Sequence, residues 1–579
     1  MPISRSPLDQ VRSGLQKTTG EAIIETLADW GVEVVFGIPG DNVDGLINGL
    51  IKERDRIKFV LVRHEENAAF MATAYAKLTG KLAACLTTAG PGAAHLTNGL
   101  FEAHRDKIPL LALTGNTDSF SLGTEQNQEY NPYLTFGDCT VWNGVLGGSL
   151  NARIVTSSAI RAAYARSGPA HLSVPVDLGL SVLPGNAPRA DHQFSKPTHA
   201  PDPEAIAKVV EALDAAKRPV LFVGRGCQGL ETALLRLADK LGAPIVKALW
   251  GKETVSDFDP HVLGGLGLIG TRPSVEAIAD ADLLLMLGTS FPYTDFLPHD
   301  TDCVTIQIDQ DPYQIGKRYP VTIGLCADVH LAVPAIAERC QRHEAREWLE
   351  RCQRSRSAWN KIMDQQAASS RTPMRPQVMA RALQECAADD AIIATDSGAN
   401  TVWMARNFLV NGRQRFIGSG LMGTMQCGLP YAIGAKFACP DRQVLAGVGD
   451  GDFVMGMGEF TTAVKYALPI VVVVFNNSKL GLIKYEEEVA GIPEFGIRFH
   501  NPDFAKFAEA CGGFGVRVED PKDARDAVRA AIASGKPAIV DAVVQPNEIP
   551  FPPKIERGQA TGYGIAFLRE MFEGIKEEG

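Results

Sequence analysis

Short, continuous runs of apolar residues constrain the fold of this chain more than any other feature of its sequence. In the last third of the 579-residue chain they occur at Ala391–Thr395, Val444–Val448 and Ile470–Phe475. Strands have this composition when helices cover both faces of their sheet, as is usual for parallel strands. Helical patterns separate these runs, so we expect an α/β fold with a parallel sheet.

The rest of the chain repeats this alternation. Strand patterns occur at Val32–Phe36, Val220–Val223 and Leu283–Leu287, and a linker rich in proline and polar residues lies at 186–203. The chain is several times longer than a usual domain of about 100 to 200 residues. We expect three doubly wound parallel-sheet domains, the first and third alike in layout, and a tail. Their predicted bounds are residues 15–190, 200–345, 370–550 and 551–579.

Composition and charge exclude several classes of function. Hydrophobic residues make up 45% and charged residues 21%, as in globular proteins, and a net charge of −10 without a basic run argues against nucleic acid as a partner. Eleven cysteines without a C-x-x-C pair indicate neither a zinc site nor a disulfide scaffold. With no apolar run near the roughly 20 residues of a spanning helix and no secretory leader pattern, we expect a cytoplasmic protein with small-molecule ligands.

The strongest local signal is Gly449–Asp452, which directly follows a predicted buried strand. Asn476–Asn477 follows the next strand, and Asn477 stands 27 residues after Asp450. Carboxylate and amide oxygens at the ends of neighbouring parallel strands are suitable ligands for Mg²⁺. The glycines let the backbone approach phosphate oxygens closely. Each fragment alone is an ordinary turn, but the pair at this spacing predicts a metal and diphosphate site.

This spacing resembles the motif of the thiamine diphosphate enzymes. The resemblance implies that Asp450 and Asn477 bind Mg²⁺ through their side chains and Lys479 through its backbone carbonyl. The segment Gly423–Pro430 resembles the family segment in which a bulky apolar side chain, here Met425, supports the bent cofactor. The residues that these motifs place around thiamine diphosphate are Gly423, Thr424, Met425, Asp450, Gly451, Asp452, Asn477, Lys479, Leu480, Gly481, Leu482 and Ile483.

Glu65 matches the glutamate of the same family. It lies in Arg63–Ala69, which opens a predicted helix after a strand. The resemblance implies that Glu65 is catalytic and hydrogen-bonds a ring nitrogen of the cofactor's aminopyrimidine. A glutamate in a first helical turn by itself only complements the helix dipole. Family sites are shared between subunits, so the resemblance implies a homodimer at minimum, with a homotetramer as the expected assembly.

The middle segment is similar to pyruvate oxidases, which include the quinone-reducing pyruvate dehydrogenase. In those enzymes the corresponding segments bind FAD, and Asp309, at the end of a predicted strand, suits a ribose hydroxyl. The resemblance therefore divides the chain into pyrimidine-binding, central FAD-binding and diphosphate-binding domains. The residues implied around FAD are Gly267, Leu268, Ile269, Gly270, Thr289, Ser290, Phe291, Pro292, Tyr293 and Asp309.

The function implied by the resemblance is oxidative decarboxylation of a 2-oxo acid. Pyruvate is the expected substrate, acetate or acetyl phosphate the product, and the electrons pass through FAD to quinone or O₂. The residues expected to face the substrate are Asn42, His95, Asn127, Gln128, Leu482 and Glu486.

Two missing aromatic rings leave a rival function open. Asn127 and Leu482 stand where related enzymes have phenylalanine. Acetolactate synthases keep a flavin without using it for redox chemistry, so the alternative is a non-redox carboligase or decarboxylase with structural FAD. A non-catalytic relative is a second alternative, against which the presence of Glu65, Asp450 and Asn477 argues.

The end of the chain gives weak support for membrane contact. Gly562–Phe572 is similar to the start of the lipid-binding tail of the quinone enzyme. A short helix with Ile565, Leu568 and Phe572 on one face more often packs on its own protein than on lipid. We therefore expect this helix to pack on its own protein.

Overall fold

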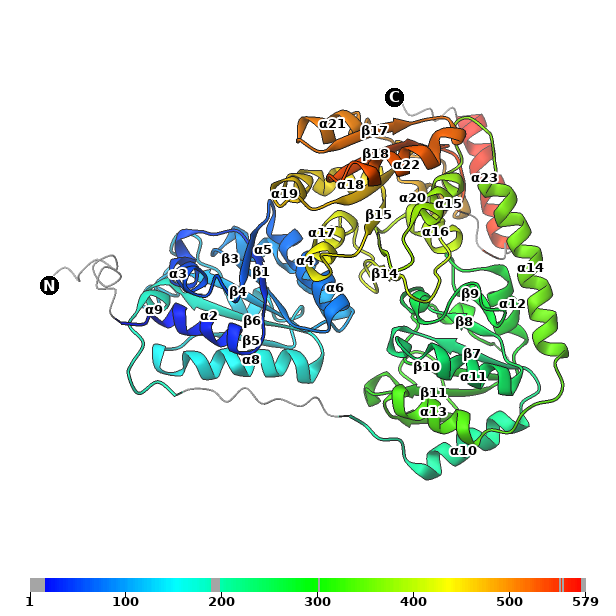
Figure 1. Ribbon diagram of the computed structural model, residues 1–579, viewed down its shortest axis with the longest axis horizontal. Helices are drawn as coiled ribbons and strands as arrows, with labels where there is room; N and C mark the ends of the chain where they lie inside the picture. Colours follow the sequence, from blue (N-terminus) through cyan, green and yellow to red (C-terminus); the bar gives the residue numbers. More distant parts are fainter. Residues whose placement is uncertain (1–15, 189–197, 300–301, 551–552, 554–556, 574–579) are drawn as a thin grey trace, which may run out of the picture. The chain divides into compact units, whose positions relative to one another are not determined.

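Three six-stranded parallel sheets form the framework of the protein (Figure 1). The structure is a computed structural model that describes residues 16–188, 198–299, 302–550, 553 and 557–573; half of the predicted linker at 186–203 therefore lies outside the described residues. The chain divides into two compact units. The first sheet belongs to the first unit and the other two sheets to the second. These sheets, with helices between their strands, confirm the predicted α/β class.

The first unit contains residues up to 197, together with 418–442 and 455–470. Its sheet has the order β2-β1-β3-β4-β6-β5, with β1 (Val34–Gly37), β2 (Lys58–Leu61), β3 (Ala83–Thr87), β4 (Leu110–Asn116), β5 (Trp142–Val145) and β6 (Pro169–Pro175). Helices cover both faces of this sheet: α2 (Thr19–Asp29), α3 (Asp44–Lys52) and α8 (Ala152–Arg166) share one core, whereas α4 (Glu65–Thr79) packs with α6 (Thr97–Arg105).

The third sheet has the same strand order as the first. It reads β14-β13-β15-β16-β18-β17, with β13 (Ile392–Thr395), β14 (Arg415–Ile417), β15 (Val444–Gly449), β16 (Ile470–Asn476), β17 (Phe514–Val518) and β18 (Ala538–Val543). Its helices in the second unit include α15 (Pro376–Cys386), α16 (Ala399–Asn407), α20 (Gly481–Val489), α21 (Phe504–Ala510) and α22 (Ala524–Ala533). Numbered from its own first strand, each sheet reads 2-1-3-4-6-5, which agrees with the predicted likeness of the two segments.

The middle sheet has a different order, β12-β11-β10-β7-β8-β9. Its strands are β7 (Pro219–Val223), β8 (Ile245–Lys247), β9 (Val262–Gly265), β10 (Leu283–Leu287), β11 (Val304–Asp309) and β12 (Ile323–Cys326). Numbered from its first strand, this is the order 3-2-1-4-5-6, which is typical of dinucleotide-binding folds. The helices α10 (Pro203–Ala215), α11 (Glu231–Leu241), α12 (Arg272–Asp280) and α13 (Val329–Arg339) connect these strands or flank them.

Two further helices lie outside the sheet connections. The helix α14 (Glu347–Ala367) follows the middle sheet, and α23 (Arg557–Glu573) ends the described chain. The tail helix contacts its own protein, because Gly562 lies against the carbonyl of Val489 and Arg569 Nη1 donates to Gly491 O at 3.2 Å. No helix in the described ranges is long and apolar enough to cross a membrane.

A buried ion network joins α4 and α6 to α17 (Gly428–Ala438) within the first unit. Lys77 Nζ lies 2.5 Å from Asp106 Oδ2 and 3.4 Å from Glu102 Oε1, and it donates to Tyr431 Oη at 3.0 Å. Burial raises the pKa of Glu102, an effect that Lys77 opposes and Asp106 reinforces. The lysine is therefore the cation that allows two carboxyl groups to be buried side by side.

We predict that Lys77→Met destabilises the protein by about 3–5 kcal/mol, because removing one partner leaves buried charges uncompensated. The free energy of unfolding in urea, followed by circular dichroism, measures the effect. Lys81→Met is the matched control, since Lys81 forms a half-exposed pair with Glu33 and should cost less than about 1 kcal/mol. Equal losses in the two variants would contradict the assignment.

Candidate active site

The two residues predicted to bind the metal ion through their side chains, Asp450 and Asn477, lie next to each other in the second unit. Asp450 begins α18 (Asp450–Gly456) where β15 ends, and Asn477 follows β16. The backbone N–H groups of Asn477 and Ser478 donate to Asp450 Oδ2 at 2.9 and 2.6 Å, and Asn501 Nδ2 donates to the same oxygen at 2.8 Å. The parallel pairing of the strands thus brings both oxygen donors to one sheet edge.

The surroundings of Asp450 suit a cation. Burial raises the pKa of this carboxyl group to about 6, although its hydrogen bonds favour the ionised form. A divalent cation bound to the carboxylate would favour ionisation further. The carboxylate of Asp450, the amide oxygen of Asn477 and the carbonyl of Lys479 are all hard oxygen donors, the type that Mg²⁺ prefers. The donor set therefore fits the predicted ion.

Glycines keep side chains out of the adjoining turns. A Cβ added at Gly449 would lie 2.7 Å from Asp452 Oδ2, and one at Gly398 would lie 2.8 Å from Asn400 Oδ1. Asp452 accepts from the N–H of Gly449 at 3.0 Å. Burial, with repulsion from Asp396, holds the pKa of Asp452 well above its usual range. Bare backbone and a carboxyl group that burial biases toward its neutral form suit a ligand rich in oxygen atoms.

The segment after Asn477 is held by charge. Lys479 Nζ lies 2.8 Å from Glu494 Oε1 and donates to Asn547 Oδ1 at 2.9 Å, so its side chain is occupied and its carbonyl is the available ligand. On α20, which begins at Gly481, Leu482 is half-buried and Ile483 and Glu486 are exposed. Leu482 and Glu486 stand four residues apart, which places them on one face of the helix.

The predicted cofactor loop with Met425 belongs to the first unit. Gly423 has a positive φ of 63°, and Met425 is half-buried. Thr424 Oγ1 accepts from Asn98 Nδ2 at 2.9 Å, and Gln426 Nε2 donates to Asn67 Oδ1 at 2.8 Å. These bonds fix the loop against α4 and α6 of the same unit.

Glu65 is the first residue of α4, directly after its N-cap residue His64. Its Oε2 lies 2.9 Å from His95 Nδ1, and the rings of His64 and His95 stack with centroids 4.4 Å apart. Gly92 leaves space beside the other carboxylate oxygen, since an added Cβ would lie 3.2 Å from Glu65 Oε1. The hydroxyl of nearby Thr87 is buried without a hydrogen-bond partner among the described residues. An unfilled polar edge beside a buried glutamate fits a nitrogen-rich ring.

Two of the predicted substrate residues meet at the same edge of the first sheet. Asn42 Nδ2 donates to Gln128 Oε1 at 3.2 Å. Gln128 has a φ of 62°, a conformation that costs energy for a residue with a side chain. It packs on Gly90, where an added Cβ would lie 2.9 Å from Gln128 Cβ. Asn127 is exposed. The structure therefore places Asn42 in contact with Gln128, and the backbone of Gln128 is held in a strained conformation.

The central sheet places its candidate site between β7 and β10, where the strand order reverses. Gly224 and Gly226 follow β7, and Gly226 N donates to Gly288 O at 3.1 Å beyond β10. An added Cβ at Gly224 would lie 2.4 Å from Gly288 O. Turns without side chains at this point let a diphosphate approach the backbone. Asp309 ends β11 beside β10, and its Oδ1 accepts from Asp311 N at 2.9 Å.

The two predicted flavin loops touch each other. Gly267 has a φ of 95°, and an added Cβ would lie 3.3 Å from Phe291 Cζ. The ring of Phe291 packs edge-on against Phe222 and Tyr293, at centroid distances of 5.1 and 5.6 Å. Thr289 is buried, its carbonyl accepting from Gln307 Nε2 at 3.2 Å. Leu268, Ile269 and Pro292 are half-buried, and Ser290 O accepts from Arg318. These loops pack together, and the exposed ring of Tyr293 beside them suits contact with a flat aromatic ring system.

Sequence analysis did not single out several residues of these sites. Gly224 and Gly226 follow a predicted strand, so their Gly-Arg-Gly pattern could have indicated a ligand-binding turn. Asn501 bonds to Asp450 from 51 residues away, and Arg406 bonds to the turn Gly267–Gly270 from more than 130 residues away. No local pattern marks residues of this second kind.

Comparisons with known proteins agree with this arrangement. The chain matches the thiamine pyrophosphate enzyme profiles for the N-terminal TPP binding domain at residues 17–133, the central domain at 206–336 and the C-terminal TPP binding domain at 396–542. It is 43% identical over 562 residues to YdaP of Bacillus subtilis, whose name describes it as thiamine pyrophosphate-containing, with 97% of both chains covered.

Two named enzymes are similar over almost the same length. Pyruvate oxidase of Lactiplantibacillus plantarum is 33% identical, with 96% of this chain and 93% of the relative covered. Acetolactate synthase of Mycobacterium bovis is 31% identical, with 92% and 88% covered. The chain therefore belongs to the thiamine pyrophosphate (thiamine diphosphate) enzyme family.

Proposed function

We propose that this protein is a thiamine diphosphate- and FAD-dependent enzyme that decarboxylates pyruvate oxidatively, to acetate or acetyl phosphate. The observation that carries the flavin-binding part of the proposal is the central sheet. It has the 3-2-1-4-5-6 order of dinucleotide-binding folds, and glycine turns meet where that order reverses. Full-length similarity to a protein named pyruvate oxidase supports the choice of substrate.

The chain's residues divide the work between binding and proton transfer. Asp450, Asn477 and the carbonyl of Lys479 would hold Mg²⁺, and the glycine turns beside them would hold the diphosphate. Thiamine diphosphate, when bound there, would supply the nucleophile and the electron-accepting ring that decarboxylation of a 2-oxo acid requires. Glu65 would hold the proton that activates the ring, with its Oε2 kept in place by His95. In this proposal Gln128 and Asn42 orient the substrate.

Bound FAD would accept the two electrons of the oxidation and pass them to quinone or O₂. Water or phosphate then provides the oxygen of the product. The contribution of the protein is to hold the flavin at the surface made by Gly267–Gly270 and Thr289–Tyr293, with Asp309 placed to accept a hydrogen bond from a ribose hydroxyl.

A non-redox carboligase with structural FAD is the second candidate. The half-buried Leu482 and its neighbours Leu480 and Ile483 are aliphatic, so the first turn of α20 carries no aromatic ring beside the predicted site. Similarity to an acetolactate synthase, at nearly the same identity as to pyruvate oxidase, supports this candidate.

We propose a homodimer or homotetramer as the assembly. Large apolar side chains are exposed in segments that precede or follow the predicted cofactor motifs: Leu421, Met422, Val454, Met455, Ile492 and Phe495. Exposed apolar residues in such numbers are typical of subunit contacts.

We predict that pyruvate, added without oxygen to the protein loaded with Mg²⁺, thiamine diphosphate and FAD, bleaches the visible flavin band as CO₂ is released. An absorbance spectrum before and after the addition, with CO₂ measured in parallel, is sufficient. A band that persists while CO₂ appears would establish the carboligase instead. A band that persists without CO₂ would exclude pyruvate as the substrate.

Glu65→Gln should lower kcat by about 10²- to 10⁴-fold, the range that a positioned acid or base contributes. The variant should bind thiamine diphosphate and unfold at the temperature of the native protein. Glu66→Gln is the matched control, because Glu66 also lies in the first turn of α4 and complements the same helix dipole. Similar losses in both variants would indicate a role in the helix alone.

Asp450→Asn should weaken Mg²⁺ binding at least tenfold, since a neutral amide replaces the only charged ligand of the proposed set. Titration of Mg²⁺ in the presence of thiamine diphosphate, followed by protein fluorescence, measures this. Asp503→Asn is the control, because Asp503 caps α21 and asparagine caps a helix equally well. Unchanged Mg²⁺ affinity in Asp450→Asn would remove Asp450 from the site.

A further inference from the structure

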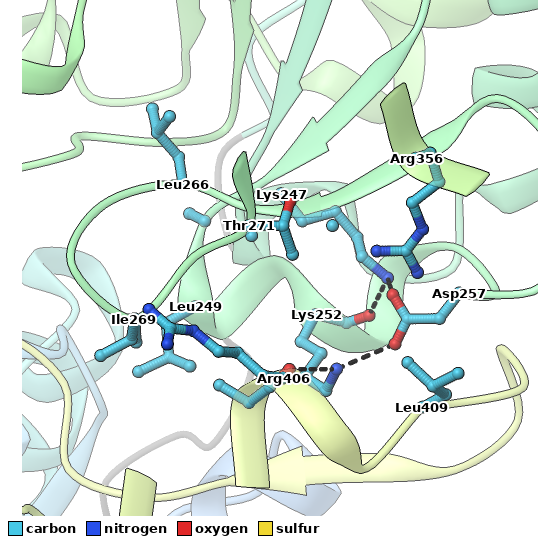
Figure 2. A pocket seen from close by; sticks show the side chains of 14 residues that line it. Lys247, Leu249, Lys252, Asp257, Leu266, Ile269, Thr271, Arg356, Arg406 and Leu409 are labelled. Carbon is cyan, nitrogen blue, oxygen red and sulfur yellow. Dashed lines mark hydrogen bonds and ion pairs between the residues drawn. The ribbon is translucent and has the colours of Figure 1, made fainter. Parts of the chain in front are cut away.

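Arg406 lies at the end of α16, and its side chain reaches the central domain. Its Nε donates to Gly270 O at 2.9 Å and its Nη2 to Leu268 O at 2.7 Å. Both carbonyls belong to the predicted flavin turn Gly267–Gly270. Figure 2 shows Arg406 beside Ile269 of this turn, in a pocket lined by both domains. The contact joins two segments of the second unit that are far apart in the chain.

The burial of this side chain indicates that the contact is specific. Burial lowers the pKa of Arg406 to about 10, which still leaves the guanidinium charged at neutral pH. A buried charge is costly unless hydrogen bonds compensate it. A guanidinium donates in fixed directions, so two of its N–H groups determine the orientation of two acceptors together. Here the acceptors are alternate carbonyls of one short turn.

The hydrogen bond that closes this turn does not use the two carbonyls that Arg406 binds. Gly267 has a φ of 95°, and the turn closes through a hydrogen bond from Gly270 N to Gly267 O at 2.9 Å. Glycine turns are conformationally permissive. Without the guanidinium, two carbonyls in the pocket would lose their donor and the turn would relax.

The other end of α16 lies at the predicted diphosphate site. Asn400, in its first turn, donates through Nδ2 to Gly447 O of β15 at 3.3 Å. The preceding Gly398 packs against Asn400 and Asp452. A nine-residue helix is about 13 Å long. One short helix therefore contacts both predicted cofactor sites of this unit.

We propose that Arg406 is a positioning residue that holds the turn Gly267–Gly270 in the conformation that receives the flavin, so that α16 fixes this turn relative to the diphosphate site. The inference rests on the proposed function to the extent that the protein binds FAD.

An ion cluster beside Arg406 holds the backbone around this residue in place. Asp257 lies 2.6 Å from Lys247 Nζ and 2.8 Å from Lys252 Nζ, and it accepts from Val410 N at 3.0 Å. Figure 2 shows Asp257 beside both lysines. Lys252 also donates to Ala405 O at 3.0 Å, directly before Arg406. The end of α16 is thus anchored to the central domain, and the Arg406 side chain extends from a fixed point.

Arg356 provides a matched control. It lines the same pocket, is equally buried and donates through Nη1 to Leu263 O at 2.9 Å. Leu263 belongs to β9 and not to the flavin turn. Replacing Arg356 therefore removes a buried guanidinium from the pocket without removing a donor of the turn.

The experiment compares the full-length native protein with Arg406→Met, Arg406→Lys and Arg356→Met. Each is stripped of flavin and titrated with FAD in the presence of Mg²⁺ and thiamine diphosphate, with binding followed by flavin fluorescence. We expect FAD affinity to fall at least tenfold in Arg406→Met, to fall less in Arg406→Lys, and to stay within twofold in Arg356→Met. The affinity for thiamine diphosphate and Mg²⁺ should stay within twofold in all variants.

The outcomes separate this inference from the proposed function. A native protein that binds no FAD refutes the flavoenzyme proposal, and the inference with it, before any variant is compared. If the native protein binds FAD, then unchanged affinity in Arg406→Met, or an equal loss in Arg356→Met, overturns the positioning role. Melting temperatures test the folding of each variant. If Arg406→Met does not fold, the comparison of Arg406→Lys with Arg356→Met decides, through affinity and through the visible spectrum of bound flavin.

Discussion

Parallel pairing of strands is the constraint on which every candidate site of this protein depends, and in each sheet one central pair joins strands that are not consecutive in the chain. β1 pairs with β3, β7 with β10 and β13 with β15, each time in parallel. At such a pair the connections leave in opposite directions, so the turns beyond the strands diverge, and doubly wound proteins bind ligands there. Glycines such as Gly226 and Gly398 keep these turns free of side chains. Each site is therefore a consequence of sheet topology first and of individual residues second.

Buried charge connects the C-terminal part of the chain to the other domains. In the first unit, Lys77 joins α4 to α17 through Tyr431. In the second unit, Asp257 and Lys252 join the central domain to the end of α16. Such ion pairs contribute little net stability relative to apolar packing, but breaking one partner is costly. They favour one arrangement of helices over others, which keeps the predicted cofactor-binding turns in fixed positions.

Flavin binding and flavin reduction place different demands on this scaffold. The proposed binding requires turns without side chains, an acceptor for the ribose and an exposed aromatic ring, for which Gly224, Asp309 and Tyr293 are the candidates. Reduction also requires an electron donor with suitable chemistry near the flavin. The aliphatic first turn of α20 is relevant to reduction and not to flavin binding. The two candidate functions therefore share one structure and differ in the use of the same cofactor.

The sequence by itself determined the local elements and the chemistry of the strand ends. The apolar runs defined strands such as β16, and the spacing of Asp450 and Asn477 defined their place at one sheet edge, because burial and period act over a few residues. Tertiary structure alone decided which distant residues meet. Asn501 reaches Asp450, His95 reaches Glu65, and Arg406 reaches the turn Gly267–Gly270 only after strands have paired and helices have packed. These contacts depend on geometry accumulated over many residues, which leaves no periodic trace in the sequence.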